Sequence, residues 1–281
     1  MRALLELVRA PAALSVPGDT LAGAAAAGRR PAAGLALASV LMYWSGMALN
    51  DWADREEDAA ERPERPIPSG RISPGAALGL AAALTGAGLA TAALAGGRRG
   101  LTVAGLLAGA VWAYDLRLKR TAAGPASMAA CRVLDVLLGA GDQTRAALPA
   151  ALSIGAHTYG ISVLGRAEVT GAAPGTAERA LAASTVAAGL AAVTCVRGGA
   201  AARAGAGVLI AGYLASTVPV QAGLRTLPDP GNVRRAVRLS ILGLIPLQAA
   251  VVAGGGRFAT AGALLCSLPA GRWLSSRVAT S

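Results

Sequence analysis

Aromatic side chains and charge are both scarce in this sequence. Only 3% of the 281 residues are aromatic, with a single Phe, and only 15% are charged. Soluble domains carry about 25% charged residues, so the composition is not that of a soluble domain. The three cysteines, Cys131, Cys195 and Cys266, form no CxxC pair. We expect them to be small buried apolar residues. No nucleotide-binding fingerprint is present.

The sequence is rich in long apolar runs. Hydrophobic residues make up 54% of the chain, and the mean hydropathy is +0.53. Runs of this length are typical of membrane proteins. Small residues let membrane helices approach closely, so these Ala- and Gly-rich runs predict an all-α, multi-span transmembrane bundle of nine or ten helices in a single domain, 1–281. The candidate spans are 12–28, 33–50, 74–95, 100–115, 122–141, 147–165, 178–196, 203–222, 236–254 and 257–271.

The basic residues are unevenly divided between the two ends of these spans. The formal net charge is +11, but most Lys and Arg residues fall in connections on one side, including Arg272 and Arg277 near the C-terminus. By the positive-inside rule that side is cytoplasmic, which predicts a multi-pass protein of the cell membrane with acidic lipid headgroups as neighbours. Membrane topology therefore explains the charge without a nucleic-acid partner. No clear cleavage site follows the N-terminus, so we expect no signal peptide.

The most unusual stretch is NDWADREEDAAERPERPIPSGRIS, residues 50–73, on the predicted cytoplasmic side. If residues 50–58 end a helix, Asn50, Asp51, Asp54 and Asp58 fall within an arc of about 100°. Like charges on one helical face repel, whereas Mg²⁺ prefers carboxylate oxygens together with substrate phosphates. The spacing alone also fits an acidic helix end in headgroup water.

Arginines and prolines follow these acids directly. Arg62, Arg65 and Arg71 alternate with prolines that restrict the loop. Acids that bind metal beside arginines that bind phosphate are the groups that a diphosphate requires.

These residues resemble the first signature of the UbiA superfamily of intramembrane prenyltransferases. The family pattern is Asn-Asp-x-x-Asp-x-x-x-Asp followed by Arg-Pro-(Ile/Leu)-Pro-Ser-Gly-x-Ile. The sequence of this stretch looks especially like those of the chlorophyll synthase and digeranylgeranylglyceryl phosphate synthase branches. The resemblance is sharp only in this stretch, although the layout of spans is similar along nearly the whole chain.

The resemblance implies a helical bundle around a central cavity and Mg²⁺-dependent transfer of a prenyl group from a prenyl diphosphate to an acceptor. It implies that Asp51, Asp54 and Asp58 are catalytic and, with Asn50, bind the metal. Asn50, Arg62, Arg65 and Arg71 would contact the donor. Metal-bound diphosphate leaves more readily because its developing charge is neutralised, and a water-poor cavity would protect the allylic fragment.

The loop YDLRLKRT, residues 114–121, is similar to a second family loop. Lys119 and Arg120 are candidates for gripping the diphosphate, although ordinary positive-inside charge also explains them. Asp115 is placed to pair with Lys119 four residues later. We expect Tyr114 to be an interfacial aromatic residue.

The sequence departs from the family pattern at its second acidic motif. The corresponding stretch, residues 157–175, contains no aspartate, and Glu168 is its only acid. Glu168 could hold a second Mg²⁺, alone or with water. Alternatively, Arg166 could replace that metal as a phosphate clamp, or the second site could be lost.

Four polar residues within the predicted spans are further candidates. We expect Arg132 and Asp135, three residues apart, to pair with each other because isolated charges there are costly; the alternative is that they line the cavity. Asp19 is a weaker candidate for the cavity wall. His157 is either a hydrogen-bonded membrane histidine or a base that deprotonates an acceptor hydroxyl.

The leading hypothesis is therefore a Mg²⁺-dependent prenyltransferase. One alternative is a membrane protein that binds or carries a prenyl lipid without turnover. A secondary transporter is a third class, but no inverted repeat or paired broken helices support it. The acceptor stays open among a carboxylate, a glycerol phosphate, a cyclitol or sugar hydroxyl, and an aromatic ring, and the donor length is also open.

Overall fold

The computed structural model describes residues 2–9, 16–196 and 198–267, and its secondary structure over these residues is entirely helical. Arg197, Arg272, Arg277 and the end of the predicted span 257–271 lie outside the described residues. The helices are α1 (Arg2–Leu7), α2 (Pro17–Ala26), α3 (Ala33–Ala53), α4 (Arg55–Glu61), α5 (Pro74–Ala113), the π-helical turn η2 (Tyr114–Leu118), α6 (Gly124–Ala140), α7 (Thr144–Gly165), α8 (Thr176–Cys195), α9 (Ala200–Gly223) and α10 (Pro230–Gly254), followed by a short apolar helix, Phe258–Ser267.

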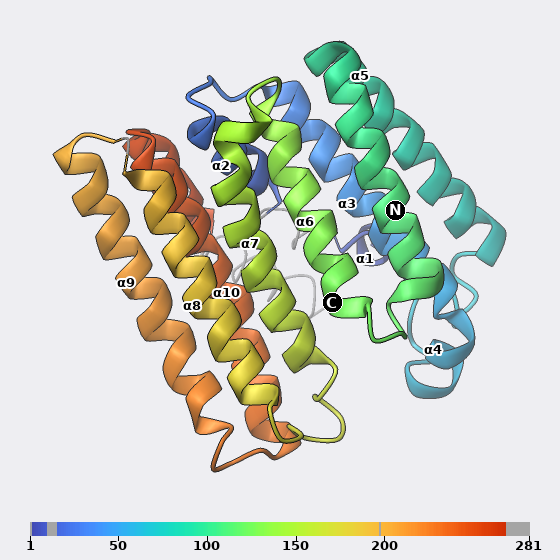
Figure 1. Ribbon diagram of the computed structural model, residues 1–281. Coiled ribbons are helices and arrows are strands. Elements are labelled where there is room, and N and C mark those ends of the chain that lie inside the picture. The colour runs from blue at the N-terminus through green and yellow to red at the C-terminus, as the bar shows by residue number, and fades with distance from the viewer. Residues whose placement is uncertain (1, 10–15, 197, 268–281) are drawn as a thin grey trace.

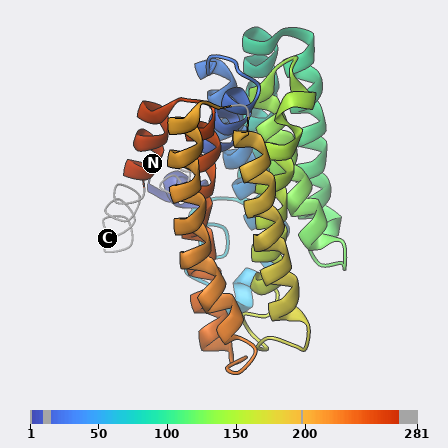
Figure 2. The same ribbon diagram turned by 60° about the vertical axis from the view of Figure 1, so that its left-hand side comes forward.

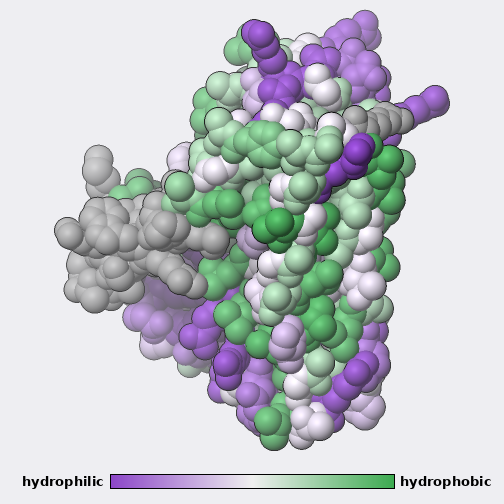
Figure 3. Space-filling model, turned by 90° about the vertical axis from the view of Figure 1, so that its left-hand side faces the viewer, coloured by the Kyte–Doolittle hydropathy of each residue, from purple (hydrophilic) through white to green (hydrophobic). Residues whose placement is uncertain are grey.

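The predicted multi-span bundle is confirmed. Among the described residues, five helices are long and apolar enough to cross a membrane: α3, α5 with its continuation to Leu118, α7, α9 and α10. Apolar surface occupies the middle of the molecule and polar surface gathers at its two ends, as Figure 3 shows for one face. This distribution is the one that a bilayer requires.

Helix α5 is a hairpin of two arms rather than one continuous rod (Figure 1). The backbone breaks at Gly97, whose φ of 61° lies in the left-handed region that glycine adopts without strain. The arms correspond to the two spans predicted at 74–95 and 100–115. The break places Arg98 and Arg99 at the turn, where their side chains can reach water.

The connections alternate between the two ends of the bundle (Figures 1 and 2). Residues 62–73, 119–123, 166–175 and 224–229 lie at one end, and the Gly97 turn lies at the other with the connections around residues 27–32, 141–143 and 198–199. The loops predicted from charge to share one side therefore do so.

Helix α2 covers ten residues of the predicted span 12–28, of which residues 12–15 lie outside the described structure. Its ten residues extend about 15 Å, half of a bilayer core. It lies deep in the bundle against α6, where a Cβ on Gly139 would fall 2.0 Å from the carbonyl oxygen of Thr20. Only glycine permits this approach, so α2 packs backbone to backbone and closes the inner side of the bundle.

Small side chains dominate the core. The cluster that joins α2 and α6 to α7–α10 consists mainly of Ala and Val, while a second cluster joins α3, α5 and α6. Cys131 and Cys195 are buried as expected. The expectation is wrong for Cys266, which is exposed because the short helix that carries it lies at the surface of the described structure.

Candidate active site

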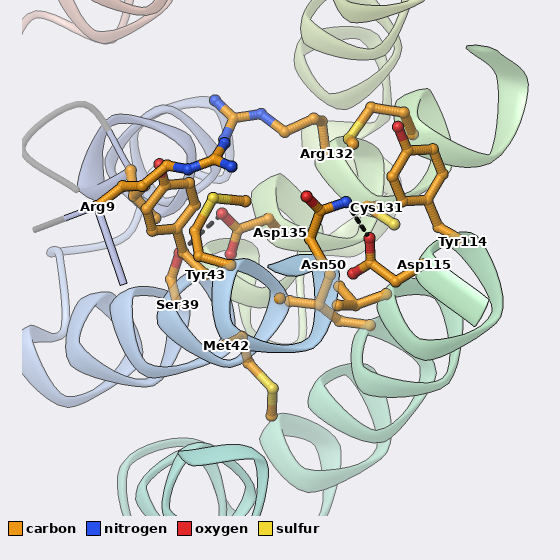
Figure 4. A pocket seen from close by; sticks show the side chains of 16 residues that line it. Arg9, Ser39, Met42, Tyr43, Asn50, Tyr114, Asp115, Cys131, Arg132 and Asp135 are labelled. Atoms are coloured by element: carbon orange, nitrogen blue, oxygen red, sulfur yellow. Dashed lines mark hydrogen bonds between the residues drawn. The ribbon is translucent and has the colours of Figure 1, made fainter. Parts of the chain in front are cut away.

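A cavity of about 370 Å³ opens among α3, α5, η2 and α6 (Figure 4). Its wall is largely apolar, with Met, Leu and Val side chains. The polar groups gather in two places, around Asn50 with Asp115 and around Ser39 with Asp135. The polar and charged residues that line it are Arg9, Ser39, Tyr43, Asn50, Tyr114, Asp115, Arg132 and Asp135.

The acidic stretch does not form one continuous helix. Helix α3 ends at Ala53, Asp54 has φ −95° and ψ 6°, and α4 begins at Arg55. The predicted common arc of four side chains is therefore wrong, because the backbone leaves the helical conformation at Asp54. The acids instead divide into two groups that face different cations.

Asp51 and Asp58 form the first group. Both are buried, at 5% and 4% exposure, and both lie beside Arg65. Arg65 Nη1 is 2.5 Å from Asp58 Oδ2 and 3.5 Å from Asp51 Oδ1, and Arg9 Nη2 is 3.1 Å from the same Asp51 oxygen. Arg62 is more distant, at 4.0 Å from Asp58. Two carboxylates from separate helices thus converge on one guanidinium group.

Asp54 belongs to the second group and joins the first loop to the second. Its carboxylate lies 2.8 Å from Lys119 Nζ and 2.9 Å from Arg120 Nη2. Arg120 also pairs with Glu57 at 2.7 Å. The hydrogen bond to Asp54 and the charge of Glu57 raise the pKa of Arg120 above its ordinary value. Arg120 is therefore always positive.

Asn50 and the second loop meet at the cavity wall. Asn50 Nδ2 donates to Asp115 Oδ1 at 3.0 Å, as drawn in Figure 4. The predicted pair of Asp115 with Lys119 is present at 3.9 Å. Tyr114, at the start of the π-helical turn, also lines the cavity.

Three other predicted residues lie farther from these acids. Arg71 pairs with Glu6 at 2.6 Å and donates to the carbonyl of Glu64. Arg166 donates to the carbonyl of Thr121 at 2.5 Å and shares a hollow with Tyr114 and Lys119.

Glu168 lines a separate groove with Arg234 and Arg238 on α10. Arg166 is thus near the second loop, whereas Glu168 shares no contact with the acids of residues 51–58 among the interactions of the described residues.

Sequence reasoning missed several residues of this region. Arg9 is not among the residues predicted for the site, because no spacing pattern connects it to Asp51. The expected pair of Arg132 with Asp135 is also wrong. Arg132 Nε lies 2.9 Å from Asp19 Oδ2 on α2, while Asp135 accepts from Ser39 on α3 at 2.7 Å. Their partners come from other helices, which spacing along one helix cannot indicate.

His157 lies in another part of the bundle. It is 1% exposed, with Nδ1 2.8 Å from the Tyr213 hydroxyl and Nε2 3.0 Å from the carbonyl oxygen of Ser240. It is not among the residues that line the cavity. This arrangement favours the hydrogen-bonded membrane histidine over the catalytic base.

The fold and this cavity define a multi-span helical bundle with an acid- and arginine-rich mouth. The sequence pattern of the UbiA prenyltransferase family matches residues 16–216. The chain therefore belongs to the UbiA prenyltransferase family.

Relatives of known name match only parts of the chain. Digeranylgeranylglyceryl phosphate synthase from Methanopyrus kandleri is 42% identical over 130 residues, 43% of this chain and 45% of that protein. The bacteriochlorophyll synthase 33 kDa chain from Cereibacter sphaeroides is 42% identical over 103 residues, 35% of this chain and 33% of that protein. The matches thus span less than half of the length of these relatives.

Solved structures share the fold over most of their length. A UbiA homologue from Aeropyrum pernix K1 has a TM-score of 0.70 at 18% identity, covering 86% of this chain and 96% of the other. A UbiA homologue from Archaeoglobus fulgidus bound to DMAPP and Mg²⁺ has a TM-score of 0.62 at 19% identity, covering 88% and 98%.

Proposed function

We propose that this protein is a prenyltransferase that moves a prenyl group from a prenyl diphosphate to an acceptor held in the cavity. The observation that carries the proposal is the meeting of two loops at the cavity mouth, where Asp54 contacts Lys119 and Arg120. Four acids and several cations face one another there beside an apolar cavity. A prenyl diphosphate has a charged head that binds metal and an apolar tail, so its two parts would match the charged mouth and the apolar cavity.

The residues present fit Mg²⁺ by chemistry. In the described part of the chain no three His, Cys, Asp or Glu side chains converge closely enough to hold a metal as they stand. Asp51 and Asp58 nevertheless approach one nitrogen of Arg65, so a cation already bridges them. Carboxylate and amide oxygens are ligands that Mg²⁺ accepts, and Asn50, Asp51, Asp54 and Asp58 would hold it. Bound Mg²⁺ would neutralise charge on the leaving diphosphate.

The cations of this chain would bind the diphosphate directly. Lys119 and Arg120 now pair with Asp54, and Arg65 pairs with Asp51 and Asp58. With Mg²⁺ held by these acids, the cations would be available to donate charge-assisted hydrogen bonds to phosphate oxygens. The C–O bond of the donor would break beside a wall of Met, Leu and Val side chains. This wall excludes water that would otherwise capture the allylic fragment. The electron pair would leave with the diphosphate, and the freed carbon would bond to the acceptor, which would lose a proton.

Arg166 is the better candidate of the two residues proposed for the second site. It borders the same hollow as Lys119, so its guanidinium group could reach a phosphate held by the second loop. Glu168 lies in a groove beside Arg234 and Arg238. We therefore propose that Arg166 clamps phosphate here, and that Glu168 contributes a metal ligand only if the connection after α7 moves.

The chain would act as one membrane domain, residues 1–281, with its active-site loops on the cytoplasmic side of the cell membrane. The long loops and most of the arginines share one end of the bundle, and that bias sets orientation in membranes. The partners would be a prenyl diphosphate, an acceptor and the surrounding lipid.

Pyrophosphate release from geranylgeranyl diphosphate tests this function. Purified protein would be assayed with and without Mg²⁺ in membrane extract that supplies native acceptors. We expect Mg²⁺-dependent release that falls about 100- to 1,000-fold in Asp54→Ala, because one charge-stabilising group is worth that much. Glu56→Ala is the matched control on α4, since Glu56 is exposed and pairs only with Arg55 among the described ion pairs.

The same assay separates the competing hypotheses. Loss of release in Glu168→Ala would assign that acid to the second site, and loss in Arg166→Met would assign the guanidinium group. Donor binding without release, over several donor lengths, would replace the transferase by a protein that carries prenyl lipid.

A further inference from the structure

A groove with arginines at its head lies on the outer side of the bundle, where α10 begins beside the connection that follows α7. One of its lining residues comes from that connection and the others come from α10. They are Glu168, Arg234, Val237, Arg238, Ile241 and Leu242. None of the cations proposed to bind the donor is among them, so the groove is a site of its own.

The cations and the apolar side chains of the groove share one face of α10. At 100° per residue, Arg234, Arg238, Ile241 and Leu242 fall within an arc of about 100°. Both arginines are exposed, and Ile241 is 53% exposed. Ile241 follows Arg238 by three residues, so the apolar surface begins about 4.5 Å farther along the helix axis. Charged surface therefore passes directly into apolar surface.

This change from charge to apolar surface falls at the level of the lipid headgroups. Helix α10 has 25 residues and extends about 37 Å, whereas the hydrocarbon core of a bilayer is about 30 Å thick. The charged residues of α10 all lie in its first nine residues, so the excess length belongs to that end. Arg234 is then at headgroup level, and the longer reach of the Arg238 side chain brings its charge to the same level.

Both guanidinium groups have hydrogen-bond donors to offer. Arg234 Nη1 donates to the backbone carbonyl of Glu168 at 3.1 Å, which holds the side chain over the groove and leaves its other N–H groups for a ligand. Arg238 forms no ion pair or hydrogen bond with any residue that the structure describes. Glu168 is the one acid of the groove lining, and it accepts from Arg234 through its backbone and not through its carboxylate.

The charge of the groove suits a single phosphodiester. Two arginines and one glutamate line it, so its formal charge is +1. The next charged residues along the chain, Asp229 and Arg235, have opposite signs and leave this balance unchanged. A phosphodiester carries one negative charge, whereas a diphosphate carries more and is usually bound with Mg²⁺ and several carboxylates. Positive-inside charge explains why arginines are frequent at this end, but not why two of them stand at the head of an apolar groove.

We propose that this groove binds one anionic phospholipid of the surrounding membrane. Arg234 and Arg238 donate charge-assisted hydrogen bonds to the phosphate oxygens, and an acyl chain lies against Ile241 and Leu242. The site goes beyond the proposed prenyltransferase function and does not depend on it.

Lipid titrations of the purified full chain test this site. Delipidated protein in a neutral detergent would be titrated with dioleoylphosphatidylglycerol or with dioleoylphosphatidylcholine, and native mass spectrometry would count the bound lipid molecules. We expect the first phosphatidylglycerol molecule to bind about tenfold or more tightly than phosphatidylcholine. Each arginine near a membrane surface contributes roughly fivefold to the binding of anionic lipid.

Arginine variants connect that preference to the groove. Arg238→Gln should weaken phosphatidylglycerol binding about fivefold and leave phosphatidylcholine binding unchanged. Arg235→Gln is the matched control, because Arg235 is also exposed at the start of α10 but does not line the groove. It should change either affinity less than about twofold. The double variant Arg234→Gln, Arg238→Gln should lower the preference to about twofold or less. Melting temperatures measured in the same detergent show that each variant is folded.

Four results would overturn the proposal. Equal binding of the two lipids would remove the preference, and equal losses in Arg235→Gln and Arg238→Gln would assign it to the general positive charge of this end. Displacement of the lipid by excess inorganic phosphate would assign the groove to a free anion. Displacement by an equal concentration of geranylgeranyl diphosphate without Mg²⁺ would assign it to the donor. Because the measurement counts bound lipid and not turnover, its result is independent of the transferase function.

Discussion

The two halves of the bundle use buried polar groups in different ways. The first half, residues 16–140, buries five carboxylic acids: Asp19, Asp51, Asp58, Asp115 and Asp135. In the second half, described residues 144–196 and 198–254, no Asp, Glu, Lys or Arg is buried. Both halves are helical and Ala-rich, so the contrast concerns charge and not architecture.

In the second half, the buried polar side chains are neutral and hydrogen-bond to one another. Ser184 donates to Gln221, Gln221 donates to the hydroxyl of Ser240, and His157 lies between Tyr213 and the carbonyl of Ser240. Each contact joins two different helices. Such a network fixes how the helices pack without introducing an ionised group into the membrane.

The comparison indicates where function is concentrated. Buried charge is expensive to retain, and among the described residues it is confined to the half that forms the cavity. We infer that the first half carries the buried acids of the site, and that the second half supports them and contributes Arg166 from the connection after α7. Four predictions can break or sharpen that division.

Removal of Arg132 should have the largest effect on stability. Arg132→Met leaves the fully buried Asp19 without its ion pair, and loss of one partner of a buried pair costs about 3–5 kcal/mol. Denaturant unfolding in detergent measures the loss. The double variant with Asp19→Leu should recover part of it, because the unpaired acid is gone. A loss below about 1 kcal/mol would show that this buried charge is not held by pairing.

Lys119 and Arg120 sharpen the contrast within the charged half. Both contact Asp54, but the Lys119 side chain is 11% exposed and that of Arg120 is 63% exposed. Hydrogen bonds to charged groups are worth about 1.5–3 kcal/mol when shielded from water, whereas exposed pairs are worth less than about 1 kcal/mol. We expect Lys119→Met to weaken donor binding about 10- to 100-fold and Arg120→Met to weaken it less than about fivefold. Equal effects would mean that burial does not separate their roles.

His157 tests the supporting half. His157→Phe leaves the Tyr213 hydroxyl and the Ser240 carbonyl without their partner, which costs about 1–3 kcal/mol of unfolding free energy. Mg²⁺-dependent pyrophosphate release should change less than about twofold at a temperature where the variant is folded. A loss of release comparable to that of Asp54→Ala would revive the catalytic-base hypothesis and break the comparison between halves.

The sequence predicted the helices well, because helices depend on local pattern. Apolar runs between charged connections located most spans, and Arg98 and Arg99 marked the hairpin turn in α5. The pairing of Asp115 with Lys119 followed from a four-residue spacing on one helix. Features that depend on residues close in sequence could therefore be read without coordinates.

Contacts between distant helices could not be read in this way. Arg132 pairs with Asp19, 113 residues away, and not with Asp135 on its own helix. Arg9 reaches Asp51 across 42 residues. The bend at Asp54 was also missed, because a helical projection assumes that the backbone stays regular. These features arise from tertiary packing, which overrides spacing along a single element.

Substitution of Asp229, at the surface of the second half, should have the smallest effect on the unfolding free energy. Asp229 Oδ1 accepts from the backbone N–H groups of Gly231 and Asn232, and Oδ2 accepts from the Asn232 side chain. These hydrogen bonds at the start of α10, above all those from Asn232, lower the pKa of Asp229 below its ordinary value. The carboxylate therefore stabilises the folded protein above the unfolded pKa near 4, and this contribution is lost as the pH falls through the lower folded pKa.

The matched variant for that effect is Asp229→Asn, which still caps the helix but does not titrate. We expect wild type to lose slightly more unfolding free energy than Asp229→Asn between pH 6 and pH 3, with the difference confined to that interval. Asp229→Ala should be weaker than both at pH 6, because the cap itself is gone. Identical pH profiles for wild type and Asp229→Asn would show that the capping charge adds nothing. The pH dependence of unfolding in this interval would then have to come from the carboxyl groups of the charged half and from exposed acids.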